Sequence, residues 1–153
     1  MTHLDGLFSL RSPNDLLQKL ESDFNRLQRA GPGSTEAQYA AFDFFVTAEH
    51  LPDWVKHSSG GSLGELRCYP EGALVSHVAS GAKHFHVEDS RHTEASDTTV
   101  VGLFDPAIFD PAIFDTELHL VIRLEDGATV DVMDVAASVL THWRDELGPS
   151  AHA

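Results

Sequence analysis

The chain has 153 residues, 42% of them hydrophobic, and a net charge of −14, which predicts one globular domain and excludes a disordered chain. Its ten lysines and arginines are too few for nonspecific nucleic-acid binding, which depends on neutralising phosphates. No apolar run reaches the roughly 18 residues that span a bilayer, and the single cysteine excludes an internal disulfide, so we expect a soluble cytoplasmic protein.

The first half of the chain predicts two long helices. Ser12, Pro13 and an acid at the third helical position form a helix start, and residues 31–33, Gly-Pro-Gly, end this helix. A second helix starts at residues 34–36 and runs to about residue 57. It is the most apolar part of the chain, so we expect it at the centre of the fold. Pro52 should kink it or begin a new turn.

The next elements are a flexible connector at residues 58–62, a short helix at 63–68 and a longer helix that opens at 70–71. Gly81 is expected to weaken or end the longer helix. The polar stretch at residues 88–98 is typical of a loop.

Two strands are predicted after this loop, at residues 99–104 and 117–124. Asp126-Gly127 is typical of a two-residue hairpin turn leading into residues 128–130. Asp131 should cap the last helix, which Gly148 and Pro149 end. The predicted fold is therefore α+β, mainly α: a bundle of three to four helices with an antiparallel β-hairpin inserted before the C-terminal helix. We expect a single domain over residues 1–153, with residues 1–11 flexible.

A five-residue repeat, Phe-Asp-Pro-Ala-Ile, occupies residues 104–115. This period fits neither helix nor strand, and each proline interrupts a strand ladder. We interpret the repeat as an extended arm. It either lies on the surface of its own domain or docks on a partner or a second copy of the chain.

The second helix carries a polar stripe. At 100° per residue, five side chains fall within an arc of about 60°: Glu36, Asp43, Thr47, His50 and Trp54. A carboxylate near a histidine can orient its ring, but a narrow polar stripe usually faces water, and this is the interpretation we favour. Trp54 indicates a groove instead, because a large indole is less usual on a wet face.

Histidines gather in Lys83-His84-Phe85-His86, where the helix should give way to extended chain. In extended chain His84 and His86 would face the same way, about 6–7 Å apart. Glu88, Asp89 or His92 would then complete a site, and zinc would fit it. His-x-His pairs are common without metal, so we predict no metal and no cofactor. Cys68 beside Arg67 is expected to be a buried thiol rather than a nucleophile.

Two motifs resemble a family of small bacterial and phage-borne proteins of unknown function. The first, Thr47 to Trp54, follows the pattern T-A-x-H-x-x-D-W, and the second places Lys-His-Phe at residues 83–85. The resemblance covers residues 37 to 147 and implies a hairpin followed by a closing helix. A more remote similarity is to HEPN-type helical domains, several of which cleave RNA. It implies a catalytic role for His84, but the upstream arginine of that motif is missing.

These features lead to three hypotheses. The first is a binding or regulatory protein, with a protein partner or a second copy of itself, whose groove is lined by two groups of residues: His50, Asp53 and Trp54, and Lys83, His84 and Phe85. The second is an enzyme, either a metal-assisted hydrolase or a HEPN-like ribonuclease, that uses His84 with or without His50. The third is an acidic mimic of nucleic acid, because residues 86–126 carry a net charge of −8. We favour the first, with nucleic acid disfavoured as a partner and no membrane partner expected.

Overall fold

The computed structural model describes residues 5–84, 95–102 and 118–148. Within these ranges the chain forms five helices and one sheet of three strands. The helices are α1 (Pro13–Arg29), α2 (Thr35–Ser59), α3 (Leu63–Leu66), α4 (Gly72–His84) and α5 (Val132–Leu147), and the strands are β1 (Ala95–Gly102), β2 (Leu118–Leu124) and β3 (Thr129–Asp131). The predicted fold class, mainly helical with a hairpin before the last helix, is confirmed.

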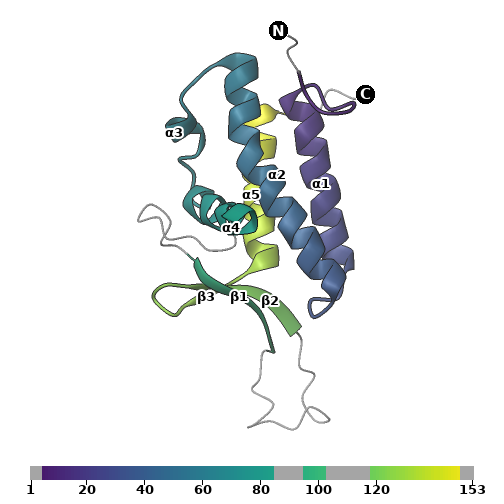
Figure 1. The fold of residues 1–153 in the computed structure, drawn as a ribbon, viewed down its shortest axis with the longest axis vertical. Helices are drawn as coiled ribbons and strands as arrows, with labels where there is room; N and C mark the ends of the chain where they lie inside the picture. The colour runs from purple at the N-terminus through teal and green to yellow at the C-terminus, as the bar shows by residue number, and fades with distance from the viewer. Residues whose placement is uncertain (1–4, 85–94, 103–117, 149–153) are drawn as a thin grey trace.

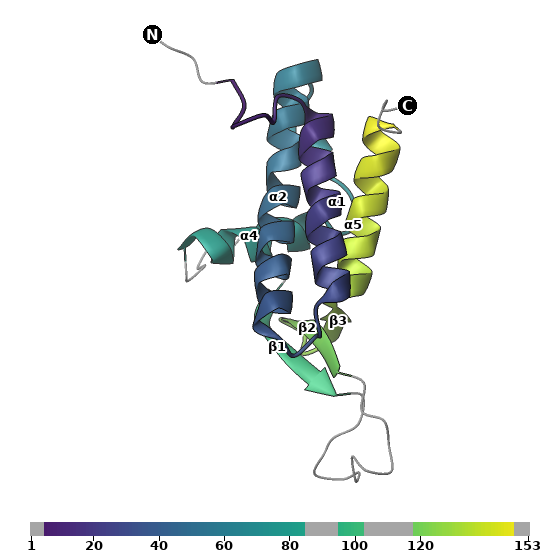
Figure 2. The same cartoon turned by 90° about the vertical axis from the view of Figure 1, so that its right-hand side faces the viewer.

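Three long helices lie side by side, and the sheet covers one end of them (Figure 1). Helix α1 contacts both α2 and α5, while α4 crosses the bundle and packs on α2 (Figure 2). The end of α1 and the start of α2 lie near the sheet, as does the start of α5. This end of the molecule therefore brings together two parts of the chain that are far apart in the sequence, the α1–α2 connection and the segment from β2 to the start of α5.

Local signals set the ends of α1 and α2. Ser12 caps α1 by accepting a hydrogen bond from the backbone N–H of Asp15, and the Asp15 side chain accepts from the backbone of Ser12 in return. Ser34 caps α2 in the same way through its hydroxyl. Helix α2 continues through Pro52, so this residue does not end it.

The sheet is antiparallel in the order β1-β2-β3. Strand β1 begins at Ala95, so the prediction of a loop up to residue 98 was wrong; pairing with β2 extends the strand into polar sequence. The hairpin between β2 and β3 also differs from the prediction. Leu124 donates its N–H to the carbonyl of Ala128, which leaves a loop of three residues, ending with Gly127 at φ 85°. This one-residue difference changes the register of β3.

One core joins α1, α2, α4, β2 and α5, and its largest fully buried side chain is Trp143. Gly81, which was expected to weaken or end helix α4, does not end it, because the helix runs on to His84. Cys68 is exposed, so the prediction of a buried thiol was also wrong. None of the described helices is long and apolar enough to cross a membrane. The repeat at residues 104–115 lies outside the described residues.

Candidate functional site

The residues that the sequence placed in one groove lie on two helices, His50, Asp53 and Trp54 on α2 and Lys83 on α4. His50 is exposed on α2, whereas Trp54 is partly buried against the core. Asp53 is exposed and lies 3.7 Å from the guanidinium of Arg67. No hydrogen bond, ion pair or ring contact joins these three side chains to Lys83 within the described part of the chain. A shared groove therefore stays a prediction.

The second group lies at the end of α4. Lys83 is exposed, and His84 is the last residue of the helix. The extended conformation that would align His84 with His86 is thus not present at His84. Phe85 and His86 lie outside the described residues. Among the described residues, no group of three histidines, cysteines or acids is arranged to hold a metal ion.

The prediction that the polar stripe of α2 faces water holds for Glu36 and His50, which are exposed, but is wrong for Thr47, which packs against α1. Thr47 is 4% exposed and donates a hydrogen bond of 3.0 Å to the carboxylate of Asp23, which is 3% exposed. Lys19 donates to both groups, at 2.7 Å to Asp23 and 2.9 Å to Thr47. A buried carboxylate needs such partners, because it would otherwise lose its hydration without compensation. Thr47 is therefore part of a helix-helix contact.

Arg26 extends this contact toward the start of α2. Its guanidinium lies 2.7 Å from Asp43 and 3.0 Å from Glu36. The hydrogen bonds that Arg26 donates to Asp43 and Glu36 raise the pKa of its guanidinium, so its charge is permanent. Glu36 and Asp43 thus join Thr47 in holding α1 and α2 together.

Glu49 and Arg67 form a second polar contact, between α2, the end of α3 and α4. Arg67 lies 2.8 Å from one oxygen of Glu49, and Ser76 on α4 donates to the other at 2.7 Å. These bonds fix the segment between α3 and α4, which carries Tyr69. The Tyr69 ring lies flat on His142 of α5, with centroids 4.1 Å apart. The bonds of Glu49 connect α2 to the end of α3 and to α4, and the stacking of Tyr69 connects this segment to α5.

Burial raises the pKa of Tyr69 to about 12, from the usual 10. Because the folded state holds the phenol proton more tightly, its contribution to stability is complete below pH 10 and is lost as the pH rises through about 12. We expect the free energy of unfolding to fall by as much as about 3 kcal/mol over this window. Urea unfolding at about pH 9 and about pH 11.5 measures the fall. Tyr69→Phe should abolish most of it; an equal fall in the variant would contradict the assignment.

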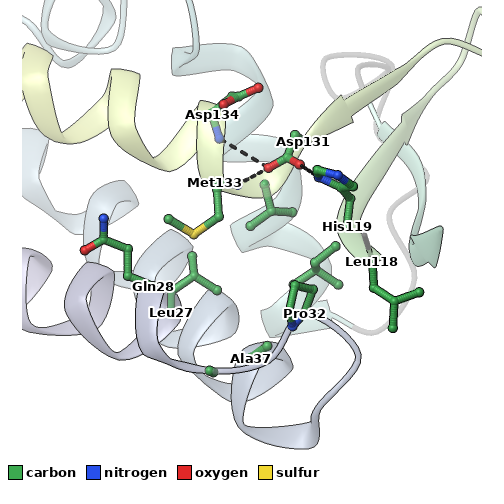
Figure 3. Close-up of a pocket in the computed structure, with 12 residues that line it drawn as sticks. Leu27, Gln28, Pro32, Ala37, Leu118, His119, Asp131, Met133 and Asp134 are labelled. Atoms are coloured by element: carbon green, nitrogen blue, oxygen red, sulfur yellow. Dashed lines mark hydrogen bonds and ion pairs between the residues drawn. The ribbon is translucent and has the colours of Figure 1, made fainter. Parts of the chain in front are cut away.

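A pocket of about 290 Å³ lies at the sheet end of the bundle (Figure 3). It is bounded by the end of α1, the start of α2, the first residues of β2 and the start of α5. Eight of its twelve lining residues are apolar: Leu27, Ala30, Pro32, Ala37, Leu118, Leu120, Val132 and Met133. The polar lining residues are Gln28, His119, Asp131 and Asp134.

His119 and Asp131 meet at the rim of this pocket. Nδ1 of His119 lies 2.5 Å from Oδ2 of Asp131, so the carboxylate accepts the Nδ1–H and fixes the tautomer and the direction of the ring. The other oxygen of Asp131 accepts the backbone N–H groups of Met133 at 2.7 Å and Asp134 at 3.4 Å. The carboxylate is thus held by the start of α5 and in turn holds His119 (Figure 3).

Strand register explains why these two side chains meet. Asp131 pairs with Val121, and His119 lies two residues before Val121 on the same face of the sheet. Diagonal neighbours of this kind are within reach of long side chains. Sequence reasoning missed the pair because it treated Asp131 only as a helix cap and His119 only as a strand residue.

Comparison with known protein families, with curated proteins and with solved structures finds no match to this chain. The resemblance to the bacterial and phage-borne family and the similarity to HEPN domains therefore stay predictions. The pocket and the His119–Asp131 pair are identified from geometry alone.

Proposed function

We propose that this protein is a binding or regulatory protein, and that it recognises an apolar side chain of a protein partner in the pocket beside His119. The apolar lining of the pocket carries the proposal. Recognition sites are usually concave and apolar, with a few polar groups that set orientation. Here Asp131 fixes His119 at the rim, so the orienting group is held in place before any partner arrives.

The chemistry of the lining favours binding over nucleophilic catalysis. A histidine oriented by a carboxylate is one half of a nucleophilic site. The other half is a serine, threonine, cysteine or lysine, and none of the twelve lining residues is of these types. Both oxygens of Asp131 already accept hydrogen bonds, which suits a structural role for this carboxylate.

The partner we propose is a protein, either another chain or a second copy of this one. The net charge of −14 and the shortage of lysine and arginine disfavour nucleic acid. Buried aromatic and aliphatic anchors dominate protein interfaces, and a pocket of about 290 Å³ suits one such anchor.

We expect N-acetylphenylalanine amide to bind this pocket with a dissociation constant of about 1 mM, because one buried ring supplies only a few kcal/mol. In an NMR titration the backbone amides of Leu118, His119 and Met133 should shift and saturate. N-acetylserine amide should produce no saturable shift, because its hydroxymethyl group gains little from the apolar lining.

Ala30→Phe places a ring in the pocket and should abolish the shifts. Ala137→Phe is the matched control, since Ala137 is exposed on α5 and does not line the pocket. Equal responses to the two amides, or loss of binding in both variants, would count against the pocket as a recognition site.

A further inference from the structure

Residues 6–10 form a tight turn, the Phe8 turn, that displays two apolar side chains. Phe8 is 86% exposed and Leu7 is 53% exposed. The turn is closed by two backbone hydrogen bonds between Leu7 and Leu10, of 3.1 and 2.9 Å. Nothing in the described part of the chain covers this aromatic ring, although the closed turn holds it in one place.

The Phe8 turn is strained. Phe8 has φ 53°, the left-handed region that costs a residue with a Cβ about 1–2 kcal/mol. Gly6 also has a positive φ, and a Cβ there would lie 2.1 Å from the carbonyl oxygen of Leu10. Asparagine or glycine would relieve the strain at position 8. A strained turn that presents a phenylalanine to solvent indicates a side chain kept for a contact.

The Phe8 turn and the pocket lie at opposite ends of α1. The turn precedes the start of the helix (Figure 2). The pocket includes Leu27, Gln28 and Ala30 at the end of the helix. Seventeen residues of α-helix separate the two ends by about 25 Å. A cavity of about 150 Å³ accepts benzene, so a pocket of about 290 Å³ has room for the ring of Phe8.

The outer side of α1 between these ends carries uncharged polar residues and no acid; Arg29, the last residue of the helix, is the one charged residue of α1 within the same arc. Asn14, Gln18, Ser22 and Asn25 lie within about 80° on the helix, and all but the half-buried Gln18 are exposed. We name these four residues the neutral face. In a protein with a net charge of −14, a face without acids is where a second copy can approach with the least repulsion.

We propose that the side chain recognised by the pocket is Phe8 of a second copy, in an antiparallel dimer that pairs the two neutral faces. This inference rests on the proposed function of the pocket. Inverting the second copy puts each Phe8 turn beside the other copy's pocket, so each pocket receives one Phe8 and both phenylalanines are covered. The contact is isologous and closes at two copies, which a head-to-tail arrangement would not do.

The size of this interface predicts its strength. A helix face about 25 Å long and about 10 Å wide falls well short of the roughly 800 Å² per partner of a standard interface. The two inserted phenylalanines must supply most of the affinity. We therefore expect a dissociation constant of about 1–100 µM rather than a permanent dimer.

Analytical ultracentrifugation from about 1 to about 300 µM tests the proposal. Wild type should shift from monomer to dimer over this range. Phe8→Ser should weaken the dimer at least tenfold, and because Phe8 is exposed the variant should keep its fold, as circular dichroism can verify. Ser22→Glu places one carboxylate from each copy close to the two-fold axis, and their repulsion should weaken the dimer as well. Ser138→Glu, on an exposed position of α5, adds the same charge outside the neutral face and should change nothing.

A wild type that stays monomeric throughout, or a dimer unaffected by both Phe8→Ser and Ser22→Glu, overturns the proposal. The titration with N-acetylphenylalanine amide distinguishes failure of the dimer proposal from failure of the pocket as a recognition site. Phe8→Ser should bind N-acetylphenylalanine amide at least as well as wild type, because no second copy competes. Monomeric protein that still binds the amide refutes only the dimer, whereas absence of amide binding in Phe8→Ser refutes the pocket.

Discussion

Trp143→Ala should lower the free energy of unfolding by about 3–5 kcal/mol, the largest effect of any substitution considered for this protein. Trp143 is fully buried in the core, on α5. Its ring meets the edge of Tyr69 at a centroid distance of 5.8 Å. Removing it leaves a cavity where α5 meets the segment that precedes α4, and neither neighbour can close this gap without breaking other contacts.

Trp54→Ala is the matched control, since it removes the same side chain from a partly buried position on α2. Urea unfolding followed by circular dichroism measures both variants, because tryptophan fluorescence is itself altered. We expect Trp54→Ala to cost less than half as much, because water already reaches part of its indole. Equal losses would mean that Trp143 does not anchor the core as its burial implies.

The sequence was sufficient for the elements that depend on local signals. The cap at Ser12, the cap at Ser34 and the apolar face of the last helix all lie within a few residues of the structure they determine. The helix containing residues 34–57 was also predicted to be central, because a wide apolar arc must touch several neighbours. Its buried residues confirm this.

The burial of Thr47 in the polar stripe of α2 was missed because it depends on another helix. Thr47 becomes buried only because Asp23 of α1 accepts a hydrogen bond from its hydroxyl and Lys19 of α1 donates one to it. A stripe that faces water and a stripe that faces a complementary polar stripe have the same periodicity. Only the charge pattern of α1 distinguishes them, and only after the two helices are paired.

Whether His119 and Asp131 meet depends on the register between β2 and β3, and a shift of one residue separates them. A two-residue turn at Asp126-Gly127 would place Asp131 opposite Ile122, on the other face of the sheet from His119. The observed three-residue loop places Asp131 opposite Val121 instead, and the pair forms. Asp-Gly is common in both kinds of hairpin, so the dipeptide alone does not determine the register.

Asp131 has two functions that substitutions can separate. Asp131→Ala removes both the cap of α5 and the acceptor for His119, and we expect it to cost about 2–4 kcal/mol of unfolding free energy. Asp131→Asn keeps a good cap, because asparagine caps helices as well as aspartate does. It should cost less than about 1.5 kcal/mol, since the remaining loss is the charge-assisted bond to His119.

The asparagine variant also changes the histidine. An amide N–H facing Nδ1 requires this nitrogen to accept, so the ring proton must move to Nε2. Nitrogen-15 NMR of the imidazole distinguishes the two tautomers directly. Asp134→Ala is the control, because Asp134 lines the same pocket and neither caps α5 with its side chain nor contacts His119. Asp134→Ala should lower the free energy of unfolding by no more than about 1 kcal/mol, because it removes only a favourable charge at the start of the helix dipole.

The combination of results decides what His119 contributes to recognition. If Asp131→Asn leaves stability nearly unchanged, switches the tautomer and weakens binding of the phenylalanine amide, the orientation of His119 is part of the recognition site. If binding is unchanged while the tautomer switches, the apolar lining alone recognises the partner, and Asp131 serves the fold. An unchanged tautomer would show that the short contact between Asp131 and His119 does not control the ring.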